Sequence, residues 1–389
     1  MVGKGATLGT LREMNTRTVL EAIVDGHPTS RAEVARRTGM AKPTVANALD
    51  ALLAAGFVRP AARPPAGPHY GAVFFEPIFG IAHVLAFDIG ARYVRGAVAD
   101  LAGSTLGRYD LPLDRHDPQS TVRTVARVCD MLLDTTQTDP ATVVASAVGV
   151  PGIVNPTDGR LRHATSQELE GFGIVAAISA ALPGATEVEN DVNLAALGEH
   201  WRGAGRGVDD FAFVTIGTGT GAGLVLDGRL RRGHCGAAGE IDYPGLRDPA
   251  PNSPAAHALV EVATARLAMR TAATKLIAPV TPETIFAAAG QGDPFAVEIV
   301  AEEARRIALT IAPICLVVDV VLIVLGGGVG LNGSQLLAPV RAELARLTPY
   351  PPRVEIAQLG DAATLTGAIA LATKTGWSRI VAQRLVAQR

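Results

Sequence analysis

The 389-residue sequence is poor in cysteine and in aromatic side chains, and it lacks a long apolar run. Its three cysteines, Cys129, Cys235 and Cys315, are too far apart for a zinc half-site or a disulfide framework, which favours a reducing compartment. No stretch of about 18 apolar residues, the length of a membrane-spanning helix, is free of charge and glycine. The N-terminus also lacks a signal-type apolar segment. Secretion and membrane insertion are therefore not expected.

Neither sign of charge dominates the whole chain, because 35 Lys and Arg residues stand against 37 Asp and Glu. This balance hides two unequal parts. Residues 1–64 contain nine Lys and Arg against five Asp and Glu, a net charge of +4, and the remainder carries −6. A short basic unit on an acidic body favours a partner with a polyphosphate backbone. The hydrophobic content of 48% indicates a folded chain, and the length suits two or three domains.

Three helical patterns lie close together near the N-terminus, over about 11–23, 30–39 and 43–54. Ser30 and Glu33 have the spacing of a capping box, and Pro43 suits a first helical position. This spacing of helices is typical of a helix-turn-helix, and apolar segments at 57–59 and 73–75 predict the two strands of a wing. Small polar side chains on the third helix can reach base edges, and nearby cations can reach phosphates. The expected DNA contacts are Arg31, Lys42, Pro43, Thr44, Asn47, Arg59 and Arg63.

A three-helix adaptor without a DNA role remains the alternative for this unit. Asp50, on the same face of the third helix, favours the adaptor, since its carboxylate would approach DNA phosphates. The positive charge and the compact spacing favour DNA binding.

From about residue 80 the pattern changes to two α/β lobes, each of which opens with a strand, a glycine turn and a second strand. In the first lobe we expect strands at 81–87, 93–99, 143–150 and 186–188 and helices at 121–134, 174–182 and 193–201. In the second we expect strands at 211–216, 222–226 and 320–325 and helices at 254–272, 295–313 and 361–373. The expected domains are 1–79, 80–200 with C-terminal helices of about 361–389 packed back on it, and 201–360.

Two glycine-rich turns follow strands of the second lobe. Gly217–Gly221 is not a P-loop, because no Gly-Lys-Ser/Thr follows, and it is not a dinucleotide fingerprint, because a strand follows instead of a helix. Its bare amides and the hydroxyls of Thr218 and Thr220 can bind an anion, although a plain tight turn gives the same pattern. Gly326–Gly328, at the end of a strand, is a second candidate for a nucleotide edge.

Asp191 is the candidate for acid–base chemistry, since it lies beside Asn190 between a strand and a helix. A carboxylate there can accept a proton from a substrate hydroxyl, while Asn190 orients a neighbouring hydroxyl. The alternative is that Asp191 only caps the helix that begins near Asn193.

In this order, the motifs resemble those of the ROK family (repressors, open reading frames and kinases), in particular its transcription-regulator branch. The resemblance covers nearly the whole chain. Ser30–Ala35 and Lys42–Val45 are similar to the family's winged helix. In the body, Asp88–Gly90 and Ile216–Gly223 resemble its two phosphate motifs, Gly149–Val154 its Pro-Gly turn, Glu189–Asn193 its catalytic motif, Gly236–Glu240 its sugar motif and Gly326–Gly328 its adenosine-side turn.

This resemblance implies a winged helix-turn-helix, mainly α, joined to a two-lobed α/β body of the actin-like, sugar-kinase (ribonuclease H-like) fold. A cleft between the lobes is expected to bind a ligand. The implied phosphate or nucleotide contacts are Asp88, Gly90, Gly217, Thr218, Gly219, Thr220, Gly221, Gly327 and Gly328. The implied sugar or effector contacts are Asn190, Asp191, Glu240, Tyr243 and Glu168, with Asp191 as the base if the chain is an active kinase.

Three departures from the family pattern bear on function. The kinase motif Asp-x-Gly-Gly-Thr-Lys becomes Asp-Ile-Gly-Ala-Arg-Tyr here, with Arg92 in the turn, which argues against phosphoryl transfer. Tyr243 replaces the family's zinc-binding His and the three zinc-binding Cys are missing, so we expect no zinc or other bound metal. Glu168 stands where the family often has a sugar-facing Asn.

The sequence therefore predicts a regulator, most simply a repressor, whose degenerate kinase-like body senses a sugar or sugar phosphate. Its expected partners are double-stranded operator DNA and a second copy of the chain, in a homodimer or homotetramer, and its expected place is the bacterial cytoplasm, on the nucleoid. No cofactor is required. An active ATP-dependent sugar kinase, with ATP and Mg²⁺, is the alternative, and a regulator that has lost ligand binding is a third hypothesis.

Overall fold

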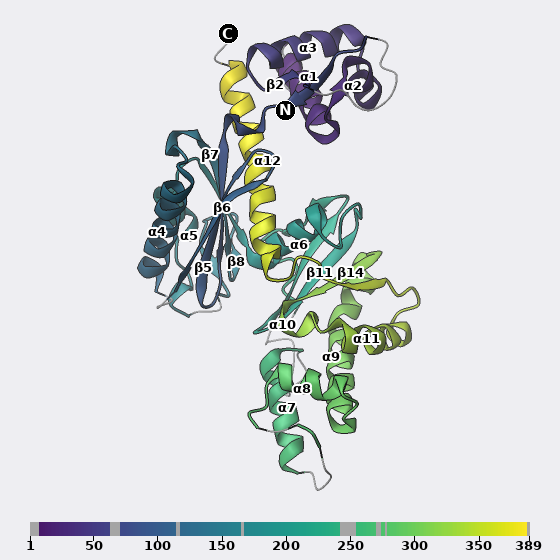
Figure 1. Cartoon of the computed structure of the whole chain (residues 1–389). Coiled ribbons are helices and arrows are strands. Elements are labelled where there is room, and N and C mark those ends of the chain that lie inside the picture. The colour runs from purple at the N-terminus through teal and green to yellow at the C-terminus, as the bar shows by residue number, and fades with distance from the viewer. Residues whose placement is uncertain are drawn as a thin grey trace.

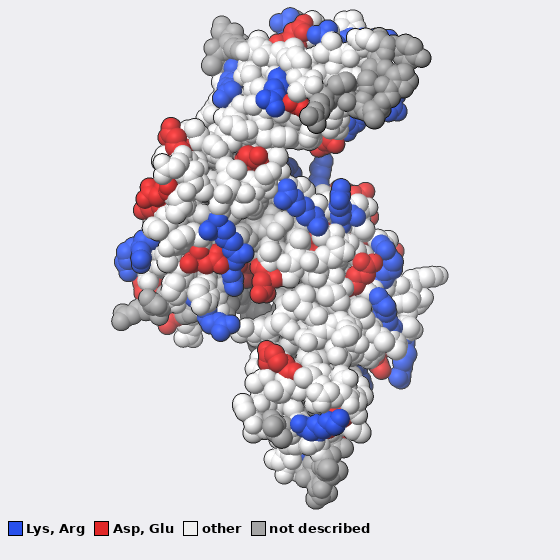
Figure 2. Space-filling model, viewed as in Figure 1, with Lys and Arg blue, Asp and Glu red and all other residues white. Residues whose placement is uncertain are grey.

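The computed structural model shows a helical head on a body of two α/β lobes (Figure 1). Among the residues that it describes, no helix is long and apolar enough to cross a membrane. Blue and red side chains are interspersed over the visible face of the body, so that face carries no broad patch of one charge (Figure 2). The described residues are 8–62, 71–113, 117–164, 167–241, 254–269, 274–276 and 278–386.

The head confirms the predicted winged helix-turn-helix. Its helices are α1 (Leu8–Gly26), α2 (Arg31–Thr38) and α3 (Lys42–Ala54), and its three short strands are β1 (Thr29–Ser30), β2 (Val58–Pro60) and β3 (Phe74–Pro77), in the order β1-β3-β2. The apolar stripe of α3 is buried as expected, with Val45, Leu49 and Leu52 at most 1% exposed. Strand β1 had no signal in the sequence, because only two residues form it.

Only half of the predicted capping box forms at the start of α2. The Ser30 hydroxyl accepts a hydrogen bond from the Glu33 amide at 3.3 Å. The Glu33 carboxylate does not reach back to the cap, because it pairs with the Arg36 guanidinium at 2.6 and 3.0 Å. The nearby cation thus competes successfully with the neutral backbone donor.

The first lobe contains a five-stranded sheet in the order β10-β7-β4-β5-β6. Strand β5 pairs antiparallel with both β4 and β6, whereas β7 pairs parallel with both β4 and β10. The sheet strands are β4 (His83–Ile89), β5 (Tyr93–Asp100), β6 (Thr105–Pro112), β7 (Val143–Val150) and β10 (Ala185–Asn190). The helices are α4 (Pro118–Thr136), α5 (Ile174–Ala181) and α6 (Asp191–Arg202), and β8 (Ile153–Val154) pairs with β9 (Leu161–Arg162) in a small separate hairpin.

The second lobe repeats this topology, with the sheet order β13-β12-β11-β14-β15. The repeat confirms the expectation that both lobes open with a strand, a glycine turn and a strand. The sheet strands are β11 (Phe211–Ile216), β12 (Thr220–Leu226), β13 (Arg229–Leu230), β14 (Leu322–Gly326) and β15 (Arg353–Ile356). The helices are α7 (Ala256–Ala268), α8 (Pro282–Gly290), α9 (Pro294–Val318), α10 (Gly327–Gly330) and α11 (Gly333–Leu347).

Helix α12 (Ala363–Val386) runs from the junction of the two lobes to the head (Figure 1). The C-terminal helices expected over about 361–389 are therefore one continuous helix, which runs well beyond the segment expected at 361–373. It crosses α6 very closely, since a Cβ added to Gly367 would lie 1.7 Å from the carbonyl oxygen of Leu194. Its far end packs into one continuous apolar core that includes Ile23 of the head and Val84 of the first lobe. The head and the first lobe thus share a core through α12.

Candidate functional site

A cavity of about 230 Å³ lies where the two lobes meet. The first lobe contributes the ends of β4 and β5 and the first turns of α6, and the second lobe contributes β11 and the turn after β14. The start of α12 closes the cavity beside them. The described residues that line it are Asp88, Gly90, Arg95, Asp191, Val192, Ala195, Phe213, Thr215, Gly327, Leu331, Gly360, Asp361, Ala363 and Thr364.

Asp191 is the first residue of α6 and faces this cavity. Asn190, one residue earlier, is the cap, because its side-chain oxygen accepts the Asn193 amide at 3.0 Å. The cap of α6 is therefore Asn190 and not Asp191, although the Asp191 carboxylate also accepts a hydrogen bond from the Val192 amide at 2.9 Å. The Asn190 side-chain nitrogen donates to the carbonyl oxygen of Gly152 at 3.1 Å, so backbone partners engage both ends of this amide.

The carboxylates around Asp191 influence one another. Burial raises the pKa of Asp191 to about 7, and the negative charges of Asp88 and Glu240 add to this rise. Burial also raises the pKa of Asp88, against the opposing charge of Arg95. Burial raises the pKa of Glu240 as well, against the charge of His163. A carboxyl group that titrates near neutral pH is suited to exchange a proton with a hydroxyl ligand.

The raised pKa predicts that replacing Asp191 by a neutral residue stabilises the folded chain, and that this stabilisation depends on pH. Between the ordinary aspartate pKa near 4 and about 7, the folded chain retains a proton on Asp191 that the unfolded chain loses. Ionisation of Asp191 therefore destabilises the fold as the pH rises through this window. We expect Asp191→Asn to raise the melting temperature more at pH 8 than at pH 5, by about 3 °C or more.

Thermal unfolding of the wild type and the variant at the two pH values measures this difference. Asp361→Asn is the matched control, because Asp361 lines the same cavity but is exposed. An increase of equal size for Asp191→Asn at both pH values would contradict the raised pKa.

The glycine turns lie together, and two of their donors, the Gly217 amide and the Thr220 hydroxyl, already have partners. A Cβ added to Gly217 would lie 3.7 Å from the amide nitrogen of Gly328, so the two turns of the second lobe are adjacent. The Gly217 amide donates to the carbonyl oxygen of Gly219 at 2.9 Å, and the Thr220 hydroxyl donates to that of Pro254. Thr218 and Gly219 are exposed, and Gly221 lies within β12.

The first phosphate motif is closed in the same way. The Gly90 amide donates to the carbonyl oxygen of Tyr93 at 2.9 Å, across the turn that joins β4 to β5. The donors that a nucleotide phosphate would need at Gly90, Gly217 and Thr220 are thus bonded within the protein. These three donors would have to give up their present partners to bind a nucleotide phosphate.

The remaining candidates for the sugar end lie outside the lining of the cavity. Glu168 is exposed on a 3-10 helix (Gln167–Leu169), and neither it, Asn190 nor Glu240 lines the cavity. Tyr243 lies outside the described residues. In the part of the chain that is described, no group of three or more His, Cys, Asp and Glu side chains is arranged to hold a metal ion.

Two ion pairs at the site were missed in the sequence. The Arg95 guanidinium lies 3.0 Å from the Asp88 carboxylate, and the hairpin register, which pairs Asp88 directly with Arg95, is the signal that could have revealed it. Arg232, just beyond β13, pairs with the buried Glu189, which also accepts hydrogen bonds from the Asn190 amide and the Asn193 side chain. This second pair links the second lobe to the segment that carries Asp191.

The head presents the predicted DNA-contact residues in two groups. Lys42, Pro43 and Asn47 are exposed on α3, and Thr44 beside them is half-buried. Arg31, at the start of α2, and Arg59, on β2 of the wing, have acidic neighbours in the head, since Arg31 lies 3.0 Å from Asp50 and Arg59 lies 2.8 Å from Glu76. Arg63 lies outside the described residues. The pairing with Arg31 gives Asp50 a partner on the face where its charge would otherwise oppose DNA.

A helix-turn-helix head on a two-lobed, sugar-kinase-like body defines a DNA-binding regulator with a ligand-sensing domain. The ROK family profile matches residues 84–375, about three quarters of the chain, and the chain therefore belongs to the ROK family. An IclR helix-turn-helix domain profile matches residues 15–61, which covers most of α1 and all of α2 and α3.

Relatives of both kinds, regulators and kinases, are similar to this chain. A xylose repressor of Caldicellulosiruptor bescii is 22% identical over 382 residues, which cover 93% of this chain and 96% of the relative. The crystal structure of a ROK family transcriptional regulator, a homologue of the E. coli Mlc protein, has a TM-score of 0.83 at 20% identity and covers 97% of this chain and 99% of that one. A ROK family glucokinase from Streptomyces griseus, solved with glucose and AMPPNP, has a TM-score of 0.63 at 27% identity and covers 75% of this chain and 100% of its own.

Proposed function

We propose that this ROK regulator represses transcription from operator DNA and releases the DNA when a sugar or sugar phosphate enters the cavity between its lobes. The observation that carries this proposal is the combination of a DNA-binding head with a body that retains Asp191 but has closed its phosphate turns. The C. bescii xylose repressor and the glucose bound in the S. griseus structure support a sugar as the ligand.

Binding to operator DNA requires the helix-turn-helix heads of two copies of the chain. Operators read by helix-turn-helix proteins have two half-sites, so a homodimer, or a homotetramer of such dimers, is the assembly that fits. In each head, Pro43, Thr44 and Asn47 would enter the major groove, and Lys42, together with Arg59 of the wing, would approach the phosphate backbone. The protein would act on the bacterial nucleoid.

Helix α12 is the element that would couple the cavity to the head. At its start, the Thr364 hydroxyl donates to the backbone carbonyl oxygen of Asp191 at 3.3 Å. Near its end, Arg384 donates to the carbonyl oxygen of Ala55 in the head at 3.2 Å. A ligand that shifts α6 would therefore move α12 and, through it, the orientation of α3. Differential affinity of the ligand for the two arrangements supplies the free energy.

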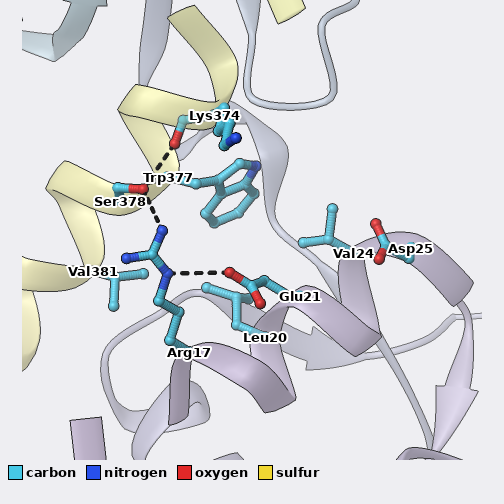
Figure 3. A pocket seen from close by; sticks show the side chains of 9 residues that line it. All are labelled: Arg17, Leu20, Glu21, Val24, Asp25, Lys374, Trp377, Ser378 and Val381. Atoms are coloured by element: carbon cyan, nitrogen blue, oxygen red, sulfur yellow. Dashed lines mark hydrogen bonds and ion pairs between the residues drawn. The ribbon is translucent and has the colours of Figure 1, made fainter. Parts of the chain in front are cut away.

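The contacts between α12 and the head are extensive (Figure 3). Arg17 of α1 donates to the Ser378 hydroxyl at 2.6 Å, beside a cavity of about 260 Å³ between the two helices. The Trp377 ring lies 6.4 Å from that of Phe57 in the head and 6.3 Å from that of Phe79, and its indole nitrogen donates to the carbonyl oxygen of Leu101 at 3.0 Å. Trp377 thus contacts the head, the connecting segment and the first lobe.

Trp377→Ala is expected to uncouple the head from the cavity. The variant removes the ring that joins the three parts, so sugar should bind within about twofold of the wild-type affinity but change operator affinity at least about fivefold less. Sugar binding by calorimetry and operator binding by fluorescence anisotropy measure the two effects separately. Phe286→Ala is the control, because it also removes an aromatic ring but from the separate core of the second lobe, away from α6, α12 and the head. A full operator response in Trp377→Ala would refute this coupling route.

An active sugar kinase is the second candidate, favoured by Asp191 in the cavity and by the kinase relative. A coupled assay of ATP consumption across hexoses, pentoses and amino sugars tests it. The proposed function predicts no turnover above background. Turnover that Asp191→Asn abolishes would establish the kinase and overturn a purely regulatory role.

A further inference from the structure

The counterion of the buried Asp88 carboxylate is a side chain of the protein, the Arg95 guanidinium. The Asp88 side chain is 8% exposed, and a buried carboxylate needs a cation or several hydrogen bonds to remain charged. Arg95, its direct partner on the neighbouring strand, donates to it at 3.0 Å. The guanidinium also lies against the phosphate turn, since a Cβ added to Gly90 would be 3.4 Å from its Nη1.

The pair belongs to a row of alternating charges across three strands. Register places Asp110 of β6 opposite Arg95, as Arg95 is opposite Asp88. Arg108 closes the row through two bonds to Asp110, at 2.7 and 3.0 Å. Each cation lies next to a carboxylate, so this row holds Arg95 in place without any ligand.

We propose that Arg95 replaces a divalent cation at Asp88, so that the cavity binds its sugar ligand without metal. Asp88 and Asp191 are close enough to influence each other electrostatically, and Mg²⁺ is usually held by one or two carboxylates together with substrate phosphates. Arginine stays charged at every physiological pH, so its charge repels a divalent ion permanently. The inference rests on the proposed sensing function of this cavity.

The position of Arg95 beside Asp88 is set by the backbone of the hairpin. Gly90 and Tyr93 close a tight turn, which fixes the register that sets Arg95 beside Asp88. Its neighbour Gly96 lies on the opposite face of the sheet, where Val128 packs so closely that an added Cβ would lie only 2.5 Å from it. The backbone therefore presents the guanidinium to the cavity and the glycine to the core.

Binding of Mn²⁺ to the full-length chain, followed by the loss of the free-ion EPR signal, tests the inference. The wild type should bind no Mn²⁺ up to about 1 mM, and Arg95→Gln should bind it at least about tenfold more tightly, because two carboxylates then lack a cation. Arg95→Lys keeps the charge and should behave as the wild type does. The double variant Asp88→Asn/Arg95→Gln removes both charges and should not gain binding.

Three results would overturn the inference. In the first, the wild type binds Mn²⁺ and Asp88→Asn abolishes this binding. This result can be obtained even if Arg95→Gln does not fold. The second is a folded Arg95→Gln with no gain, and the third is equal binding by Arg95→Gln and the double variant. Sugar-dependent release of operator DNA in EDTA tests the proposed function separately, because that release can occur whatever Mn²⁺ does.

Discussion

Asp191→Ala is expected to abolish the response of operator binding to sugar and to leave operator binding itself intact. Asp191 lies in the cavity between the lobes, and a hydrogen bond to a charged carboxylate contributes about 1.5–3 kcal/mol. The sugar concentration needed for half-maximal release of DNA should therefore rise between about 10-fold and 100-fold. Fluorescence anisotropy of a labelled operator, titrated with sugar, measures this shift.

Asp361→Ala is the control for this experiment, since it removes an exposed carboxylate from the same cavity and should shift the midpoint little. The variant also separates sensing from folding, because Asp191→Ala must still bind operator as the wild type does. A midpoint unchanged by Asp191→Ala would place the sugar elsewhere in the protein.

Lys42→Glu should have the largest effect on DNA. Lys42 is exposed at the first position of α3, where a helix-turn-helix approaches the phosphate backbone. Reversal of its charge in both heads of a dimer should weaken operator binding about 100-fold at 0.15 M salt and lower the salt dependence by about one phosphate contact per head. Anisotropy titrations across a range of salt concentrations give both quantities.

The control is Lys275→Glu, which makes the same change on the exposed surface of the second lobe. It should alter operator affinity by less than about threefold, because screening is nearly complete beyond about 10 Å. Equal losses for the two variants would show that total charge, and not the α3 face, governs DNA binding, and would favour an adaptor role for the head.

Local signals in the sequence predicted the parts of the fold that local physics decides. The apolar stripe of α3 and the Asp227–Gly228 turn, where both residues have positive φ, follow from periodicity and backbone freedom. Strand β6 was not predicted, because its residues alternate between exposed and half-buried and contain few apolar side chains. That the C-terminal helices form one continuous helix, α12, was missed as well, since its apolar residues face α6, the first sheet and the head in turn and show no single stripe.

In the candidate site, too, some residues could be predicted from local sequence and others depend on the fold. Asp191 and the glycine turns could be found from short motifs, because each motif lies within a few consecutive residues. The Arg95 pair depends on strand register, and the closure of the turns depends on partners such as Pro254, which lies 34 residues from Thr220. The bonds at Gly90 and Gly217 lie within their own turns, but the Thr220 pairing is tertiary, so a motif match predicted an available hydroxyl where the fold has already used it.

Operator affinity with and without sugar is the most direct test of the central claim. Genomic fragments selected by the full-length protein supply the operator, and xylose, glucose, N-acetylglucosamine and their phosphate esters form the panel. We expect at least one sugar to weaken operator binding by about 10-fold or more, within the usual range of allosteric coupling, with loss of the effect in Asp191→Ala. Operator binding that no sugar alters, together with ATP-dependent phosphorylation of one of them, would contradict the regulator and establish a kinase.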